Sequence, residues 1–175
     1  MILYLMRHGI AEDRGPSGAD FDRRLTEAGR VFVHTAAVAL LGARSAAPLP
    51  RLLASPLVRA EQTARIVLHV ACAPGARVEV RDELASGSLP LGLVEDLTAS
   101  GQDALLVGHQ PTLEQLARHL VAPKATASTG RDGPSLPRGF STCVIMALAR
   151  EASEPRWTLV SVLDPRDLAP PLDAR

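Results

Sequence analysis

Three short apolar runs in this chain each end at a group of polar residues, and a segment with helical spacing follows each of them. The runs cover Ile2 to Met6, Arg51 to Ser55 and Ala104 to Val107. Apolar runs of this length, without a polar residue at every second position, are typical of strands buried on both faces. Strands that alternate with helices favour an α/β fold in which helices cover both faces of a sheet. We therefore predict a three-layer α/β/α sandwich with a mostly parallel central sheet.

The remaining elements follow from periodicity and from the residues that start and stop helices. Thr26 is a suitable N-cap for a helix that extends to Leu41, with Gly42 as its C-terminal stop. Pro56 stands where a second helix can begin. The other expected elements are helices over 57–70, 89–99 and 113–120, and strands over 77–81, 142–148 and 157–163.

The length of 175 residues fits one domain better than two. Residues 15–24 and 123–139 are rich in turn-forming residues and are expected to be loops. The segment from Asp164 contains Pro165, Pro170 and Pro171 and is expected to pack little. We thus expect one domain over residues 1–163, followed by a proline-rich tail over 164–175.

Composition excludes several classes of protein. Nineteen basic side chains balance nineteen acidic ones, which argues against a dedicated nucleic-acid binder. The apolar N-terminus is too short for a signal peptide, and no apolar run approaches the roughly 18 residues that a membrane span needs. Cys72 and Cys143 form no CxxC pair, and the five histidines show no HxxxH or HExxH spacing, so no metal site is indicated. We expect a cytoplasmic protein that uses no metal and no cofactor and contacts neither nucleic acid nor membrane.

The polar residues that follow the three apolar runs are expected to meet. The carboxyl ends of parallel strands lie at one edge of a sheet, where sites form in α/β proteins. The segments there are Arg7-His8-Gly9, residues 55–59 and residues 108–111. Together they bring two arginines and two histidines to that edge: Arg7, Arg59, His8 and His109.

These residue types suit a phosphate group. Arginine presents planar, permanently charged donors that match phosphate oxygens. The helix N-termini that follow Pro56 and His109 add backbone donors. Nearby positive charges favour the neutral form of a histidine, and neutral imidazole is the nucleophilic form. Either His8 or His109 is therefore a candidate to attack phosphorus and form a phosphohistidine.

The same three segments resemble the motifs of the histidine phosphatase superfamily. Leu5-Met6-Arg7-His8-Gly9 resembles its RHG signature, residues 55–64 resemble SPxxRAxQTA, and residues 107–111 resemble a strand that ends in GHxP. The resemblance spans nearly the whole chain. It implies a phosphoglycerate mutase-like fold in which His8 is the nucleophile. It further implies that the phosphoryl oxygens are held by Arg7, Arg59 and His109.

Within the superfamily the chain is most similar to the short bacterial phosphohistidine phosphatases of the SixA type. Residues 22–29 resemble a segment of that type, although Arg24 stands where proline is usual, and Arg23 is a candidate substrate ligand at the rim. Only residues 84–107 separate Glu83 from Gly108, where the larger phosphoglycerate mutases carry a long helical insertion. The resemblance therefore implies an open site for a phosphorylated protein, such as a histidine-containing phosphocarrier or a phosphotransfer domain.

Glu83 has two interpretations. Its position after the expected strand over 77–81, and its spacing to Gly87, match the general acid of the mutases. A protonated Glu83 would give its proton to the leaving group and then activate water. Alternatively, Glu83 is an exposed loop carboxylate beside Asp82. A phosphoramidate leaving group needs less help from an acid, so the SixA-like interpretation makes Glu83 less necessary.

The leading hypothesis is a metal-independent phosphatase that hydrolyses protein phosphohistidine through a covalent phosphohistidine on His8. The first alternative is a small-molecule phosphomonoesterase of the same superfamily. The second is a non-catalytic phosphoprotein-binding domain. The intact set of His8, Arg7, Arg59 and His109 counts against a binding domain, because binding alone does not need a nucleophile.

Overall fold

The computed structural model describes residues 1–45, 47–121, 140–151 and 156–168, and it contains a six-stranded sheet. The strand order is β3-β2-β4-β1-β5-β6. The first four strands pair in parallel, whereas β5 is antiparallel to both of its neighbours, β1 and β6. The sheet is therefore mixed and mostly parallel, as predicted. The strands are β1 Ile2–Arg7, β2 Arg51–Ala54, β3 Val78–Val80, β4 Ala104–Gly108, β5 Ile145–Ala149 and β6 Thr158–Leu163.

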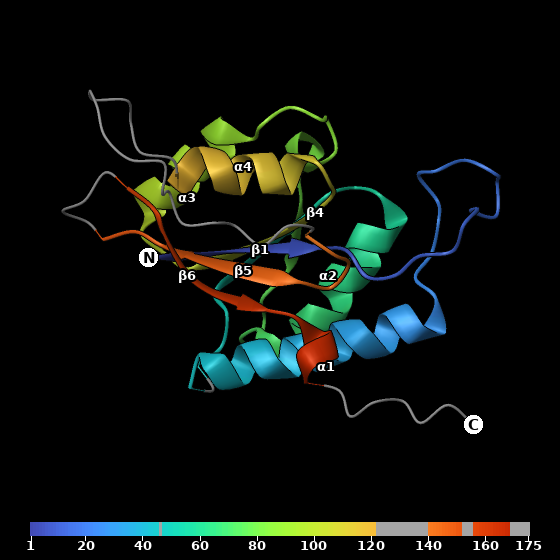
Figure 1. Ribbon diagram of the computed structural model, residues 1–175, viewed down its shortest axis with the longest axis horizontal. Coiled ribbons are helices and arrows are strands. Elements are labelled where there is room, and N and C mark those ends of the chain that lie inside the picture. The colour runs from blue at the N-terminus through green and yellow to red at the C-terminus, as the bar shows by residue number, and fades with distance from the viewer. Residues whose placement is uncertain (46, 122–139, 152–155, 169–175) are drawn as a thin grey trace.

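Helices cover both faces of the sheet (Figure 1). Because successive side chains of a strand point to opposite faces, Tyr4 and Met6 of β1 pack on the side of α1 and α2, whereas Leu3 and Leu5 pack on the side of α3 and α4. Two separate apolar cores result, and the predicted three-layer sandwich is confirmed. The helices are α1 Glu27–Ala43, α2 Val58–Ala71, α3 Leu91–Ser100 and α4 Thr112–Val121, with short 3₁₀ turns η1 Asp82–Leu84 and η2 Pro165–Asp167.

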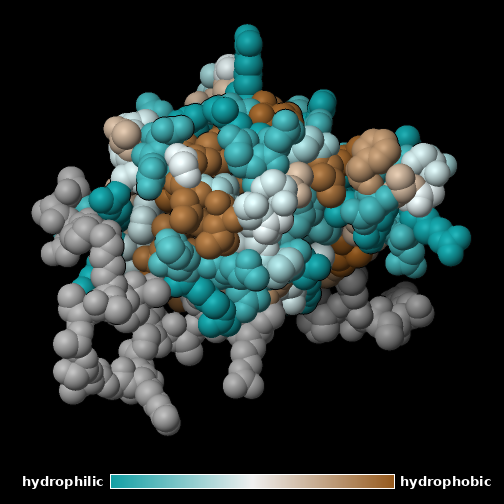
Figure 2. Space-filling view, turned by 90° about the horizontal axis from the view of Figure 1, so that it is seen from above, coloured by the Kyte–Doolittle hydropathy of each residue, from teal (hydrophilic) through white to brown (hydrophobic). Residues whose placement is uncertain are grey.

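The outer surface over α3 and α4 is mostly hydrophilic, with a group of apolar residues near its middle (Figure 2). A groove on this side is lined in part by Leu91 and Val94 of α3 and Leu120 of α4. None of the described helices is both long and apolar enough to cross a membrane.

Helix α1 begins where the sequence predicts and ends differently. The side chain of Thr26 caps it by accepting a hydrogen bond from the Gly29 N–H. The expected stop at Gly42 is wrong, because the helix continues through this residue to Ala43. The left-handed backbone conformation falls later, on Ser45, with a φ of 53°.

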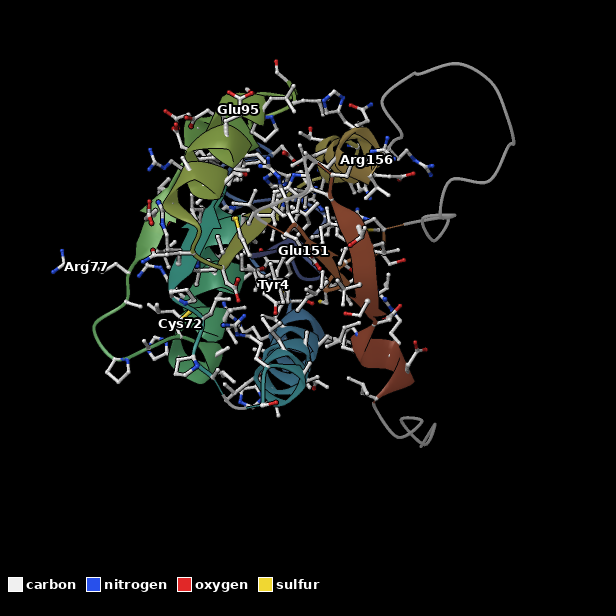
Figure 3. All side chains as sticks on the ribbon, turned by 90° about the vertical axis from the view of Figure 1, so that its left-hand side faces the viewer. Tyr4, Cys72, Arg77, Glu95, Glu151 and Arg156 are labelled. Atoms are coloured by element: carbon white, nitrogen blue, oxygen red, sulfur yellow. The ribbon has the colours of Figure 1, made fainter. Side chains whose placement is uncertain are left out.

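Tertiary contacts of Arg44 hold this helix end. Its guanidinium donates to the Tyr4 hydroxyl at 3.0 Å and to the Asp103 carboxylate at 2.8 Å. Tyr4 itself lies in the interior between the sheet and α1 (Figure 3). A side-chain anchor from another part of the chain thus replaces the glycine stop that the local sequence predicted.

Two expectations near the C-terminus need correction. The strand expected over 142–148 begins only at Ile145, because Cys143 has a φ of 68° and its N–H bonds back to the carbonyl of Arg7. The segment from Asp164 does not pack loosely as far as it is described, since Pro165 is buried and η2 contacts α1. The predicted loop over 123–139, as well as Pro170 and Pro171, lies outside the described residues.

Candidate active site

Backbone pairing brings the three polar segments together at the carboxyl edge of the sheet, toward which β1 points in Figure 1. The His8 N–H donates to the carbonyl of Gly108 at 3.1 Å, and the Ser55 N–H donates to the carbonyl of Val107 at 3.0 Å. The ladders therefore continue one residue past β1 and β2, on either side of the end of β4. His109 follows directly, and its ring centroid lies 5.0 Å from that of His8.

Gly9 allows the chain after His8 to pass close to α1 and α2. A Cβ atom at this position would lie 2.7 Å from a methyl group of Val33, so a larger residue would force the layers apart. The Gly9 N–H donates to the Thr63 hydroxyl at 3.0 Å, and that hydroxyl donates to the carbonyl of Arg59 at 2.7 Å. Thr63 thus links the nucleophile segment to the helix turn that carries Arg59, a role that the sequence did not reveal.

The hydrogen bonds of His8 specify a neutral imidazole with its hydrogen on Nδ1 and its lone pair on Nε2. Its Nδ1 lies 2.7 Å from the carbonyl of Gly9 and therefore donates, while the Arg59 Nε–H donates to Nε2 at 3.2 Å. Burial lowers the pKa of His8 to about 3, and the charges of His109, Arg59 and Arg7 act in the same direction. The Gly9 carbonyl opposes them without reversing the shift. At neutral pH the side chain is a nucleophile rather than a cation.

The contacts of His109 favour an N–H donor on its ring, whereas His8 has an acceptor at Nε2. Its Nε2 lies 2.8 Å from Ser55 Oγ, which itself accepts the Leu57 N–H, so the hydroxyl hydrogen is available for Nε2. This arrangement favours the tautomer with hydrogen on Nδ1, which is buried and has no partner among the described residues. Burial lowers the pKa of His109 to about 4, and the charges of Arg59 and Arg7 lower it further.

Arg7 and Arg59 supply the positive charge of the site. Arg7 donates from Nη1 to the carbonyl of Phe140 at 3.0 Å, and its buried Nε has no partner in the described part of the chain. Arg59 is 6% exposed and stands in the first turn of α2, where the helix dipole disfavours a cation. An anionic partner offsets this, since Nη2 donates to the Asp20 carboxylate at 2.9 Å.

Asp20 belongs to the site although no sequence signal distinguished it. It lies between Ala19 and Phe21 in a loop rich in turn-forming and charged residues, where an aspartate is common without a functional role. Its backbone carbonyl accepts from Arg59 Nη1 at 2.7 Å, in addition to the carboxylate contact. Only folding places this loop against α2, where the Val58 N–H donates to the carbonyl of Phe21 at 3.0 Å. We expected the backbone donors at the start of α2 to face an anion. The Val58 N–H is instead bonded to the carbonyl of Phe21.

Arg23 and Glu83 lie further out. Arg23 is at the rim, where it donates to the Asp20 carboxylate at 2.9 Å and to the carbonyl of Glu12 at 2.6 Å. It reaches Arg59 only through Asp20. Glu83 is exposed in η1, and its carboxylate forms no ion pair or hydrogen bond with any described residue. The structure thus brings Arg7, His8, Arg59 and His109 together, and η1, which carries Glu83, contacts β4.

The chemistry of the four residues suits an anion rather than a metal cation. Within the described ranges, no group of three or more His, Cys, Asp or Glu side chains is arranged to hold a metal ion. Arg7 Nε is a buried donor without an acceptor among the described residues, as is His109 Nδ1 in the tautomer that its contact with Ser55 favours, and an unpaired buried donor costs about 1–3 kcal/mol. A phosphoryl group has oxygens to satisfy such donors. The fold and this edge therefore define an α/β protein with a phosphoryl site centred on an unprotonated imidazole.

Comparisons with known proteins identify the family. Residues 3–89 match the profile of the Histidine phosphatase superfamily (branch 1). An uncharacterized protein of Picosynechococcus sp. (strain ATCC 27264 / PCC 7002 / PR-6) is 40% identical over 125 residues, which cover 69% of this chain and 73% of that protein. The chain belongs to the histidine phosphatase superfamily.

Solved structures place the chain near the SixA type. The protein histidine phosphatase SixA, solved with tungstate, superposes with a TM-score of 0.78 at 28% identity, covering 97% of this chain and 100% of that one. A candidate phosphohistidine phosphatase SixA from Agrobacterium tumefaciens gives a TM-score of 0.70 at 28% identity, with 93% and 97% covered. The structure is thus SixA-like over almost its full length.

Proposed function

We propose that the protein is a metal-independent phosphatase that hydrolyses phosphohistidine on other proteins. The observation that carries the proposal is the unprotonated Nε2 of His8, which lies against the Nε–H of a buried arginine, Arg59. The imidazole of the substrate takes up a proton from solvent, Nε2 attacks phosphorus, and the P–N bond breaks with its electron pair leaving on that imidazole. Water then attacks the phosphoryl group on His8 and loses a proton to solvent, the new P–N bond breaks with its electron pair returning to Nε2, and inorganic phosphate leaves.

The other three residues stabilise the phosphoryl group during both steps. Arg7 and Arg59 bring positive charge, and His109 brings a neutral N–H at Nδ1. Charge on the equatorial oxygens is what an enzyme stabilises in phosphoryl transfer, and pre-positioned donors in a partly buried site do this effectively. The buried, unpaired Nε of Arg7 supports a role as an oxygen ligand.

The short connection between β3 and β4 supports a protein substrate. Between Glu83 and β4 the chain forms only the end of η1 and the helix α3. No further helix stands in this connection. The SixA structure that this chain resembles is described as a protein histidine phosphatase. We therefore propose a histidine-containing phosphocarrier or phosphotransfer domain as the partner, with Arg23 at the rim as an additional contact.

The choice of substrate is tested by comparing turnover of a phosphorylated histidine-containing carrier protein with turnover of a panel of sugar and nucleotide monophosphates. We expect kcat/KM to be highest for the phosphocarrier. A higher value for any monoester would instead establish a small-molecule phosphomonoesterase. Binding of the carrier without release of phosphate would leave only a phosphoprotein-binding domain.

The same assay on Glu83→Gln tests the proposed general acid. An alkoxide leaving group needs a proton donor, and general acid catalysis supplies about 10²–10⁴-fold. The imidazole of phosphohistidine is protonated before the P–N bond breaks, so its hydrolysis should change little. We expect a marked loss confined to the monoesters. Equal and severe losses on both substrates would make Glu83 a general requirement, and no loss on either would reduce it to a loop carboxylate.

The protonation state of the two site histidines is testable by pH titration. Because the pKa of His8 is lowered to about 3 and that of His109 to about 4, both rings should stay neutral from pH 8 down to about pH 5. An unperturbed imidazole titrates near pH 6.5. The measurement is ¹⁵N NMR of histidine-labelled protein, with His8→Ala and His109→Ala to assign the signals. A midpoint near 6.5 for His8 would mean that half of the nucleophile is protonated close to neutral pH.

A further inference from the structure

We propose that Asp20 occupies the phosphoryl position on Arg59 and must leave it before a phosphoryl group can bind, so that Asp20 determines the affinity of the site for phosphate. This inference rests on the proposed function, because it assumes that phosphoryl groups bind beside Nε2 of His8. It concerns a residue that lies outside the three motifs and in a loop.

The geometry of the guanidinium shows the competition. In arginine, Nε–H and one N–H of Nη2 point along the same edge of the plane, which is the edge that binds phosphate and carboxylate groups in a bidentate way. Here Nε donates to His8 Nε2 at 3.2 Å, and Nη2 donates to Asp20 Oδ2 at 2.9 Å. A phosphoryl group bonded to His8 Nε2 places an oxygen beside this edge. The Asp20 carboxylate and the phosphoryl group therefore compete for the same guanidinium.

Three of the five N–H groups of Arg59 already donate to protein acceptors. Its third nitrogen, Nη1, donates to the backbone carbonyl of Asp20 at 2.7 Å, so all three nitrogens of the guanidinium donate to protein acceptors. The side chain is buried and therefore has little room to turn toward a second partner. Hydrogen bonds from Arg23 and Arg59 hold the pKa of Asp20 below its ordinary value, so the competitor is an anion at neutral pH.

The displaced carboxylate keeps a cationic partner. The other oxygen of Asp20 accepts from Arg23 Nη1 at 2.9 Å, and Arg23 is itself held by its bond to the carbonyl of Glu12. The Asp20 side chain is 63% exposed, so solvent reaches it when it leaves Arg59. Displacement of the Asp20 carboxylate therefore breaks its ion pair with Arg59 and preserves its ion pair with Arg23. The expected effect on phosphate affinity is accordingly several-fold rather than many orders of magnitude.

The same competition favours release of the product. Inorganic phosphate produced by the second step leaves a site in which a tethered anion is ready to return to Arg59. The carboxylate thus acts against product inhibition, and it does so without taking part in bond breaking.

The test is the dissociation constant of inorganic phosphate, measured by isothermal titration calorimetry on the full chain. Asp20→Asn keeps the shape of the side chain and removes its charge, so we expect phosphate to bind about fivefold tighter. Asp13→Asn is the matched control, because Asp13 is an exposed carboxylate of the same loop that pairs with no described residue. It should change the constant less than twofold.

Unchanged or weaker phosphate binding by Asp20→Asn would overturn the proposal, as would an equal gain in Asp13→Asn. Asp20→Ala provides a second variant with the same expected sign. The measurement needs no turnover, so it stays interpretable if the protein proves not to hydrolyse phosphohistidine. A protein that binds no phosphate even as Asp20→Asn would instead contradict the phosphoryl site on which the proposed function depends.

Discussion

His8→Ala is expected to remove turnover on every phosphorylated substrate, with kcat falling by a factor on the order of 10⁴ or more. The variant loses the Nε2 lone pair that attacks phosphorus, whereas Nε2 of the neighbouring His109 is held on Ser55 Oγ. Arg7, Arg59 and His109 remain, so binding of inorganic phosphate should survive. The variant should therefore separate binding from chemistry.

Rapid acid-free quenching of the wild-type protein during turnover should trap phosphate on His8. The adduct is identified by mass spectrometry of peptides and by its lability in acid, and it should be missing from His8→Ala. His109→Ala is the comparison variant: we expect slower turnover, because an oxygen ligand is lost, and an adduct still on His8. Phosphate trapped on His109 instead would exchange the roles of the two histidines.

Arg59→Ala is expected to lower kcat/KM by roughly 10³-fold, comparable to removal of one strong charge-stabilising group in phosphoryl transfer. Arg59 contacts the nucleophilic nitrogen itself and is buried beside it. Arg59→Lys should recover little, because an ammonium group cannot donate from two positions along one planar edge. These variants also remove the contact between Arg59 and Asp20. We do not expect the removal of this competing contact to compensate for the lost positive charge.

Arg65→Ala is the matched control for Arg59→Ala. Arg65 lies on the same helix, is exposed, and pairs weakly with Glu61 at 3.4 Å. Its removal should leave kcat/KM within about twofold, because exposed i,i+4 pairs contribute little. Steady-state kinetics on one phosphorylated substrate suffice for the comparison. Similar losses in both variants would show that the Arg59 effect arises from helix α2 as a whole and not from the phosphoryl site.

The layered fold was predictable because its signals are local. A run such as Ala104 to Val107 is apolar at every position, and this excludes a half-exposed strand without reference to the rest of the chain. The cap at Thr26 depends on residues three positions apart and is formed as predicted. The glycine stop at Gly42 was wrong because Arg44 finds partners in Tyr4 and Asp103, which are distant in sequence.

The residue types that meet at the carboxyl edge of the sheet were predictable from the order of motifs along the chain. Each of the four residues ends a strand or follows one after at most a short turn, so the order of elements is sufficient to bring them together: Arg7, His8, Arg59 and His109. Glu83 follows a strand as well, but β3 is at the edge of the sheet, with one strand between it and β4 and two strands between it and β1. Strand order is a property of the folded sheet and cannot be read from sequence spacing.

The chemical state of these residues depends on contacts that form when the chain folds. The tautomer of His8 follows from its contacts with Gly9 and Arg59, and its lowered pKa follows first from burial beneath segments far apart in the chain. The loop that carries Asp20 has no periodicity, and its position on Arg59 depends on docking against α2. Desolvation and ion pairing depend on distances in space of a few ångströms. The identity of the reactive groups can therefore be predicted from the sequence. The protonation state of His8, and the contact through which Asp20 competes for Arg59, form only when the layers of the fold pack together.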